Sequence, residues 1–108
     1  MREAFAHNAT VRLVPGGEHG APGAAITVEL CGHWEHEGPC PLAPHYTGAE
    51  PVGDELRLRT LFVVEPELEH RVRERIEAAL RGRWELTGSE SSEVAESELE
   101  HAQRLMRS

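Results

Sequence analysis

Apolar and polar residues alternate along three stretches of the chain, and this period of two predicts strands over 9–14, 24–34 and 56–64. A short fourth strand is predicted at 84–86, where the alternation returns before a Thr-Gly-Ser sequence interrupts it. Between the second and third strands, residues 35–53 contain four Pro and three Gly. We therefore expect a long connection without regular structure there.

The period changes to that of a helix after Glu65. Apolar residues recur every four positions and predict one amphipathic helix, which begins with Pro66 in its first turn and ends before Gly82. A weaker apolar stripe predicts a last helix over about 93–106. This last helix has three open outcomes, since it can dock on the domain, pair with a second copy or fray.

Together these elements predict an α+β fold, in which an antiparallel sheet of three or four strands carries the main helix on one face. The expected order is β-β-β-α-β-α. A length of 108 residues favours one domain, which we place at 1–88, with a C-terminal helix within 89–108.

The sheet face turned away from the main helix is expected to be mixed in character. It combines polar residues with apolar residues of the third strand, namely Thr27, Glu29, Cys31, His33, Arg57, Arg59, Leu61 and Val63. Because Leu61 and Val63 are apolar, we expect this face to be covered at its far end. The mixture favours a ligand cleft or a subunit interface.

Charge and composition narrow the class of partner. The formal net charge is −8, so we expect neither a nucleic-acid partner nor an anionic membrane surface. All 11 basic residues are Arg, a bias typical of a GC-rich, plausibly bacterial, genome rather than of a phosphate site. With neither an apolar run of membrane-spanning length nor a signal peptide in the sequence, we expect a cytoplasmic protein.

One segment carries a concentration of metal-ligand residues. Three of the seven His and both Cys lie within fifteen residues, as Cys31, His33, His36, Cys40 and His45. Thiolate and imidazole are the ligands that Zn²⁺ prefers. On a strand, residues 31 and 33 leave the same face about 6.6 Å apart, and Gly-Pro at 38–39 can turn the chain back. The sequence thus predicts a zinc site with Cys31, His33 and Cys40, and with either His36 or His45 as the fourth ligand.

The same segment allows a catalytic interpretation. His33, Glu35 and His36 offer acid and base groups that titrate near neutral pH, so they are the catalytic candidates. However, the chain contains no phosphate-binding Gly-rich loop, no G-x-S-x-G and no H-E-x-x-H sequence. Whether the protein is an enzyme stays open.

Three functional hypotheses follow. The leading one is a small cytoplasmic binding or interaction protein, a candidate homodimer, whose 31–45 segment is organised by a structural zinc ion. The second is a small enzyme or ligand-binding protein that uses His33, Glu35 and His36 in a cleft. The third is a purely structural module that contacts another protein.

Overall fold

A four-stranded antiparallel sheet and three helices make up the described part of the chain, residues 1–31 and 43–107, in the computed structural model. The strands are β1 (Glu3–Arg12), β2 (His45–Val52), β3 (Glu55–Val64) and β4 (Leu86–Ser92), and the helices are α1 (Ala21–Cys31), α2 (Glu69–Arg81) and α3 (Leu99–Met106). In space the strands follow the order β2-β3-β1-β4, with every neighbouring pair antiparallel. This is the split β-α-β arrangement of ferredoxin-like domains.

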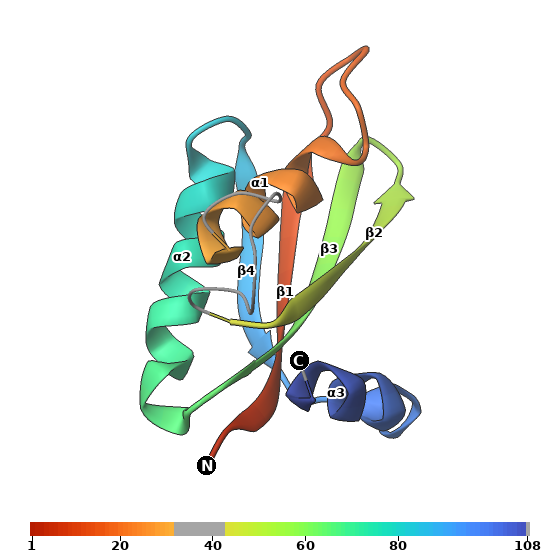
Figure 1. Ribbon diagram of the computed structural model, residues 1–108. Helices are drawn as coiled ribbons and strands as arrows, with labels where there is room; N and C mark the ends of the chain where they lie inside the picture. The colour runs from red at the N-terminus through yellow and green to blue at the C-terminus, as the bar shows by residue number, and fades with distance from the viewer. Residues whose placement is uncertain (32–42, 108) are drawn as a thin grey trace.

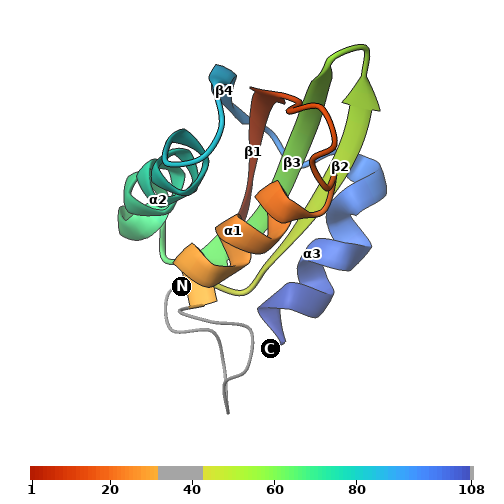
Figure 2. The ribbon, with the colours of Figure 1, turned by 90° about the horizontal axis from the view of Figure 1, so that it is seen from above.

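The helices occupy both sides of the sheet. Helices α1 and α2 pack side by side on one face, while α3 lies across one end of the opposite face (Figures 1 and 2). The larger core fills the space between the sheet and the first two helices, with Ile26, Leu30, Leu56, Leu58, Phe62, Val72, Ile76 and Leu80 fully or almost fully buried. The predicted α+β class and the main helix on the sheet are confirmed.

The strand predicted over 24–34 is wrong, because the described residues of this stretch belong to helix α1. Its buried apolar residues, Ile26 and Leu30, are four positions apart, and this spacing shares a face in a strand and in a helix alike. Val28 distinguishes the two periods. A strand would place it on the same face as Ile26 and Leu30, but its exposed fraction of 48% shows that it lies outside the core. The element order is consequently β-α-β-β-α-β-α, not β-β-β-α-β-α.

Residues 35–53 were predicted to lack regular structure, and this is wrong for their last part, which forms β2. Strand β2 lies at the edge of the sheet, where it pairs only with β3. Pro has no N–H to donate to a neighbouring strand. An edge strand has no neighbour on its open side, so Pro51 is tolerated in β2. The density of Pro and Gly misled the prediction because those residues exclude a central strand only.

Tertiary pairing also lengthens the other strands. Strand β1 begins at Glu3, six residues before the predicted strand, because β3 and β4 pair with it on both sides. The fourth strand predicted at 84–86 is wrong in its bounds, because β4 runs from Leu86 to Ser92 and includes the Thr-Gly-Ser sequence, with Gly88 paired to Thr10 of β1. The predicted helices are confirmed at 69–81 and 99–106, each preceded by a short 3-10 turn.

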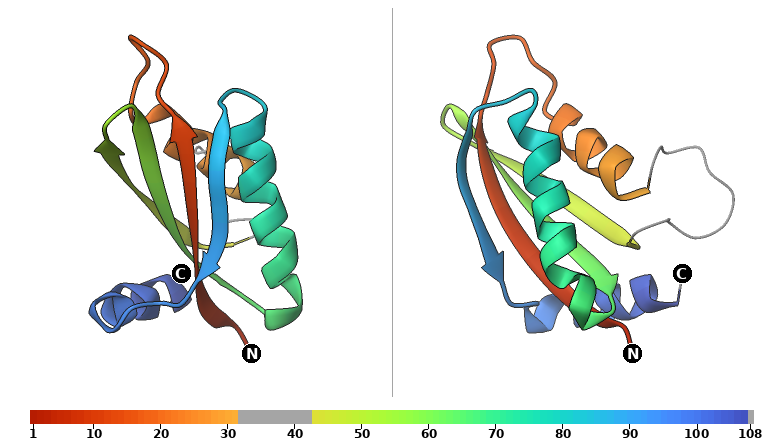
Figure 3. Two further views of the ribbon diagram at one scale, coloured as in Figure 1. Left: turned by 180° about the vertical axis from the view of Figure 1, so that it is seen from behind. Right: turned by 90° about the vertical axis from the view of Figure 1, so that its left-hand side faces the viewer.

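Helix α3 provides the cover that the sequence predicts over the far end of the sheet face turned away from α2. Leu61 and Val63 of β3, which point to this face, are only 4% and 0% exposed. Helix α3 contacts β3 and β1 there, and its buried residue is Ala102. Seen from behind, the rest of the sheet face is left uncovered by helices (Figure 3, left).

The hairpin between β2 and β3 depends on Gly53, which has a φ of +63°. Replacing Gly53 with Ala is expected to lower the free energy of unfolding by about 1–2 kcal/mol, because a Cβ is disfavoured at positive φ. Urea denaturation measures the change. Gly20→Ala is the control, since Gly20 has open space and no positive φ. Equal destabilisation by both variants would contradict this role of Gly53.

Candidate functional site

The five proposed metal ligands are only partly described by the structure. Cys31 is the last residue of α1, and His45 is the first residue of β2. Residues His33, Glu35, His36 and Cys40 lie outside the described residues. The strand spacing that we used to pair residues 31 and 33 on one face is wrong, since Cys31 ends a helix.

His45 is held between α1 and the start of β2. Its Nδ1 lies 3.1 Å from the carbonyl oxygen of Ala43, and its Nε2 lies 3.1 Å from Oγ1 of Thr27. A carbonyl oxygen can only accept, so Nδ1 carries the proton and Nε2 accepts from the Thr27 hydroxyl. Burial lowers the pKa of His45, which keeps the ring neutral. The end of α1 is thereby joined to the beginning of β2.

A hollow of about 350 Å³ opens beside this contact, between α1 and β2. It exists because small residues face each other across the two elements, and its polar lining is provided by His19, Thr27, His45 and Thr47. Thr47 in turn forms a hydrogen bond of 2.9 Å with the hydroxyl of Thr60. Among the polar groups of the hollow, Thr27 and His45 are therefore joined to each other, and Thr47 is joined to Thr60 of β3.

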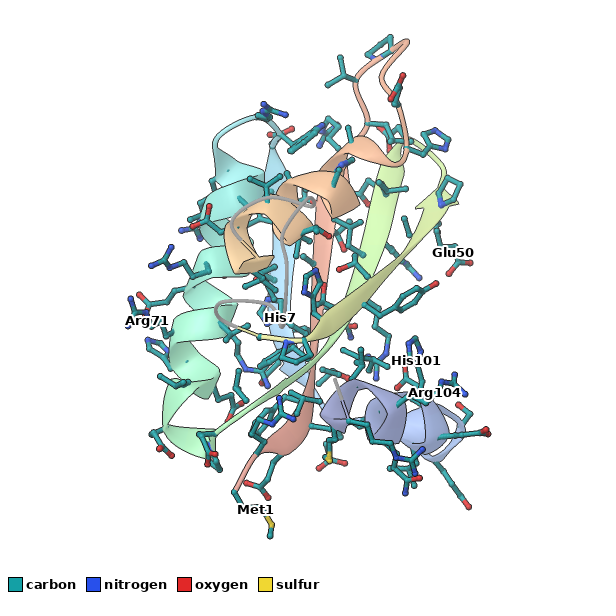
Figure 4. All side chains as sticks on the ribbon, in the orientation of Figure 1. Met1, His7, Glu50, Arg71, His101 and Arg104 are labelled. Atoms are coloured by element: carbon teal, nitrogen blue, oxygen red, sulfur yellow. The ribbon has the colours of Figure 1, made fainter. Side chains whose placement is uncertain are left out.

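His7 of β1 is one of the few buried polar residues in the described part of the chain. Its exposed fraction is only 4%, because it lies on the same face of β1 as the core residues Ala9 and Val11. Figure 4 shows it between α2 and the sheet. The guanidinium of Arg73 lies 3.1 Å from its Nδ1, and the hydroxyl of Ser89 lies 2.8 Å from its Nε2. The continuous odd-numbered pattern from Phe5 to Val11 was the available sequence signal.

The His7–Ser89 contact resembles a nucleophile and its base, but the proton is on the wrong nitrogen. Because a guanidinium has only donors, Nδ1 of His7 accepts from Arg73. Nε2 then carries the hydrogen and donates it to Ser89. Burial, and next the charge of Arg73, lower the pKa of His7, so the ring stays neutral. In this tautomer His7 cannot take a proton from Ser89, and the cluster acts as a structural link between β1, α2 and β4.

A second and larger hollow, of about 640 Å³, lies on the sheet face opposite α1 and α2. All four strands line it, chiefly through Asn8, Thr10, Gly48, Glu50, Arg57, Arg59 and Glu90. Arg57 and Arg59 were predicted on this face, and they lie there. Thr27 and Glu29 were also predicted on it, but they belong to α1 in the other layer.

Arg59 is the residue that ties α3 to this face. Its Nε and one terminal nitrogen donate to the two carboxylate oxygens of Glu98, each at 2.8 Å. Its remaining donors reach the side chains of Asn8 and Ser92 and the carbonyl of Glu93 at 2.8–2.9 Å. The Arg59 hydrogen bonds lower the pKa of Glu98 to about 2. With its five N–H groups engaged, Arg59 is a structural clamp and not a ligand-binding group.

Among residues whose side chains the structure describes, no group of three His, Cys, Asp or Glu is placed to hold a metal ion. Across the same residues, no helix combines the length and the hydropathy needed to cross a membrane. Comparisons with protein-family models and with curated proteins give no match.

Proposed function

We propose that this chain is a small binding protein whose 31–45 segment is organised by one structural Zn²⁺ ion. The proposed ligands are Cys31, His33 and Cys40, with His36 as the fourth. In the reducing cytoplasm, where we place the protein, the two Cys remain thiols and are available to the metal. Zinc bound by such residues contributes its binding free energy to folding.

The contact between α1 and β2 is the observation that carries this proposal. Thr27, one helical turn before Cys31, donates to His45, so the two ends of the ligand-rich segment are held at one place in the fold. Because the contact between Thr27 and His45 already holds the two ends of the segment together, metal binding would cost less loop-closure entropy. Helix α1 contributes Ile26 and Leu30 to the main core, and β2 is paired with β3 along its length, so both described ends of the segment belong to fixed elements.

The geometry of His45 favours His36 as the fourth ligand. Both ring nitrogens of His45 have hydrogen-bond partners, Ala43 on one side and Thr27 on the other. A metal at Nε2 would displace the Thr27 hydroxyl and break the link between α1 and β2. We therefore assign His45 a positioning role at the end of the segment.

Elemental analysis of the untagged protein, expressed in zinc-replete medium, tests the proposal. We expect about one equivalent of zinc per chain, lost in Cys31→Ser, Cys40→Ser and His36→Ala. His45→Ala is expected to keep the metal and to lower thermal stability. His70→Ala is the matched control, because the side chain of His70 is 87% exposed on α2.

Two results would contradict this assignment. Less than about a tenth of an equivalent of any transition metal in the wild-type protein rules out the site, since structural zinc is held tightly. Loss of zinc in His45→Ala together with its retention in His36→Ala reverses the choice of fourth ligand.

A further inference from the structure

The hollow on the open sheet face has a simple origin in the sequence. Gly48 of β2 brings no side chain to this face, and the side chain of Thr10 in β1 is short. The longer side chains of Glu50, Arg57 and Glu90 line the hollow around this floor, and α3 lies across one end of the same sheet face. Its volume of about 640 Å³ lies within the range of small-molecule sites.

The charges in this hollow are available to a ligand. Glu50 is the cross-strand neighbour of Arg57, yet within the described part of the chain neither residue takes part in an ion pair within 4.0 Å. Glu90, on the opposite side of the hollow, has no such pair among the described residues either. Figure 4 shows Glu50 at the edge of the sheet beside β2. The hollow thus offers the guanidinium of Arg57 outside any ion pair, with the carboxylate of Glu50 on the neighbouring strand and that of Glu90 two strands away.

We propose that this hollow binds a small zwitterion of amino-acid or dipeptide size. Its carboxylate would accept a bidentate pair of hydrogen bonds from Arg57, the geometry that a guanidinium fork favours. Its ammonium group would lie at Glu50 or Glu90. A multiply charged anion is disfavoured, because both carboxylates repel it and the chain carries a net charge of −8.

A second copy of the chain fits this face less well than a small molecule does. In a two-fold interface the same patch lies on both sides, so the hollow of one copy would face the hollow of the other. Such an interface leaves a cavity at its centre and cannot pack to the density of a stable dimer. The concave shape and the open charges both favour an occupant smaller than the hollow.

Titration of the full-length, zinc-replete protein with alanyl-alanine tests the inference by amide NMR. We expect saturable shifts confined to the uncovered part of the sheet. N-acetyl-alanyl-alanine lacks the ammonium group and alanyl-alanine amide lacks the carboxylate, so each is expected to bind about 10-fold more weakly. No saturable shift with the dipeptide, or equal affinity for the acetylated form, would overturn the proposal.

Two variants locate the site. Arg57→Gln removes the cation, and Gly48→Val fills the hollow; each is expected to reduce affinity at least about 10-fold. Gly48→Val should fold normally, because φ is not positive there and an added Cβ meets only Tyr46, at 3.8 Å. Arg83→Gln is the control, an exposed Arg outside the hollow. Unchanged binding in both variants refutes the site.

Two further measurements separate this inference from the other proposals. Zinc content should be unaffected by Arg57→Gln and Gly48→Val, since the hollow lies across the sheet from α1 and α2. Sedimentation measures the association state in parallel. Self-association that Arg57→Gln abolishes, without binding of the dipeptide, would show that a second copy occupies this face and would overturn the zwitterion assignment.

Discussion

Replacing Arg59 with Met is expected to lower the free energy of unfolding by about 3 kcal/mol and to release α3 from the sheet. The side chain is 31% exposed, and its guanidinium joins the centre of the sheet to the segment that follows β4. Loss of Arg59 leaves the carboxylate of Glu98, also largely covered, without its main partner. Hydrogen bonds to charged groups contribute about 1.5–3 kcal/mol, and several are lost together.

Lys is not expected to rescue this position. An ammonium group cannot form the two parallel hydrogen bonds to Glu98 while also reaching Asn8, Ser92 and the Glu93 carbonyl. Arg59→Lys should therefore remain at least about 1 kcal/mol less stable than wild type. Its amides in α3 should exchange faster than those of the wild-type protein.

Urea denaturation and amide exchange measure these effects. Arg57→Met is the matched control, because Arg57 lies two residues earlier on the same face, is exposed, and should change stability by less than about 0.5 kcal/mol. If Arg59→Met is as stable as Arg57→Met, or if α3 keeps its exchange protection, Arg59 is not the clamp.

Acid is expected to destabilise the fold through the buried His7 and the half-buried His45. The pKa values of His7 and His45 lie below their ordinary value of 6.5, chiefly because burial disfavours the charged ring. Below pH 6.5 the unfolded chain therefore binds more protons than the folded chain does. Stability is fully present above about pH 6.5 and is lost as pH falls through the lower folded-state pKa values.

The His7→Leu variant separates this effect from general acid denaturation. At pH 7.5 it should be about 2 kcal/mol less stable than wild type, because Arg73 and Ser89 lose their hydrogen-bond partner. The difference should narrow as pH falls to 5, since Leu has no proton to gain. Glu77 and Glu90 oppose the shift at His7 but do not reverse it.

Urea denaturation at pH 7.5, 6.5, 5.75 and 5 follows both proteins. The control is His70→Leu, because the side chain of His70 is 87% exposed on α2. A difference between His7→Leu and wild type that stays constant with pH would contradict the buried, neutral state of His7.

The hollow on the open sheet face shows which features of a site can be predicted from the alternation of residues in the sequence. Arg57 and Arg59 could be assigned to one sheet face, because side chains in a strand alternate strictly. Their different roles could not be foreseen, since the partners of Arg59 come from β1, from the end of β4 and from the turn before α3. A free guanidinium and a saturated one look alike in the sequence.

The α+β class, strand β3 and helix α2 could be predicted from the sequence, because a single period fits each of these two elements. The weaker stripe near the C-terminus predicted a terminal helix, but not where it docks. Tertiary structure decided whether 24–31 is a helix, where β2 runs, and that His7 is buried. Ile26 and Leu30 satisfy both periods, and only packing against α2 and the sheet selects the helix. Edge position likewise permits Pro51 in a strand. The local pattern is sufficient to predict an element when only the strand period or only the helix period fits it. When both periods fit, long-range contacts select the element that forms.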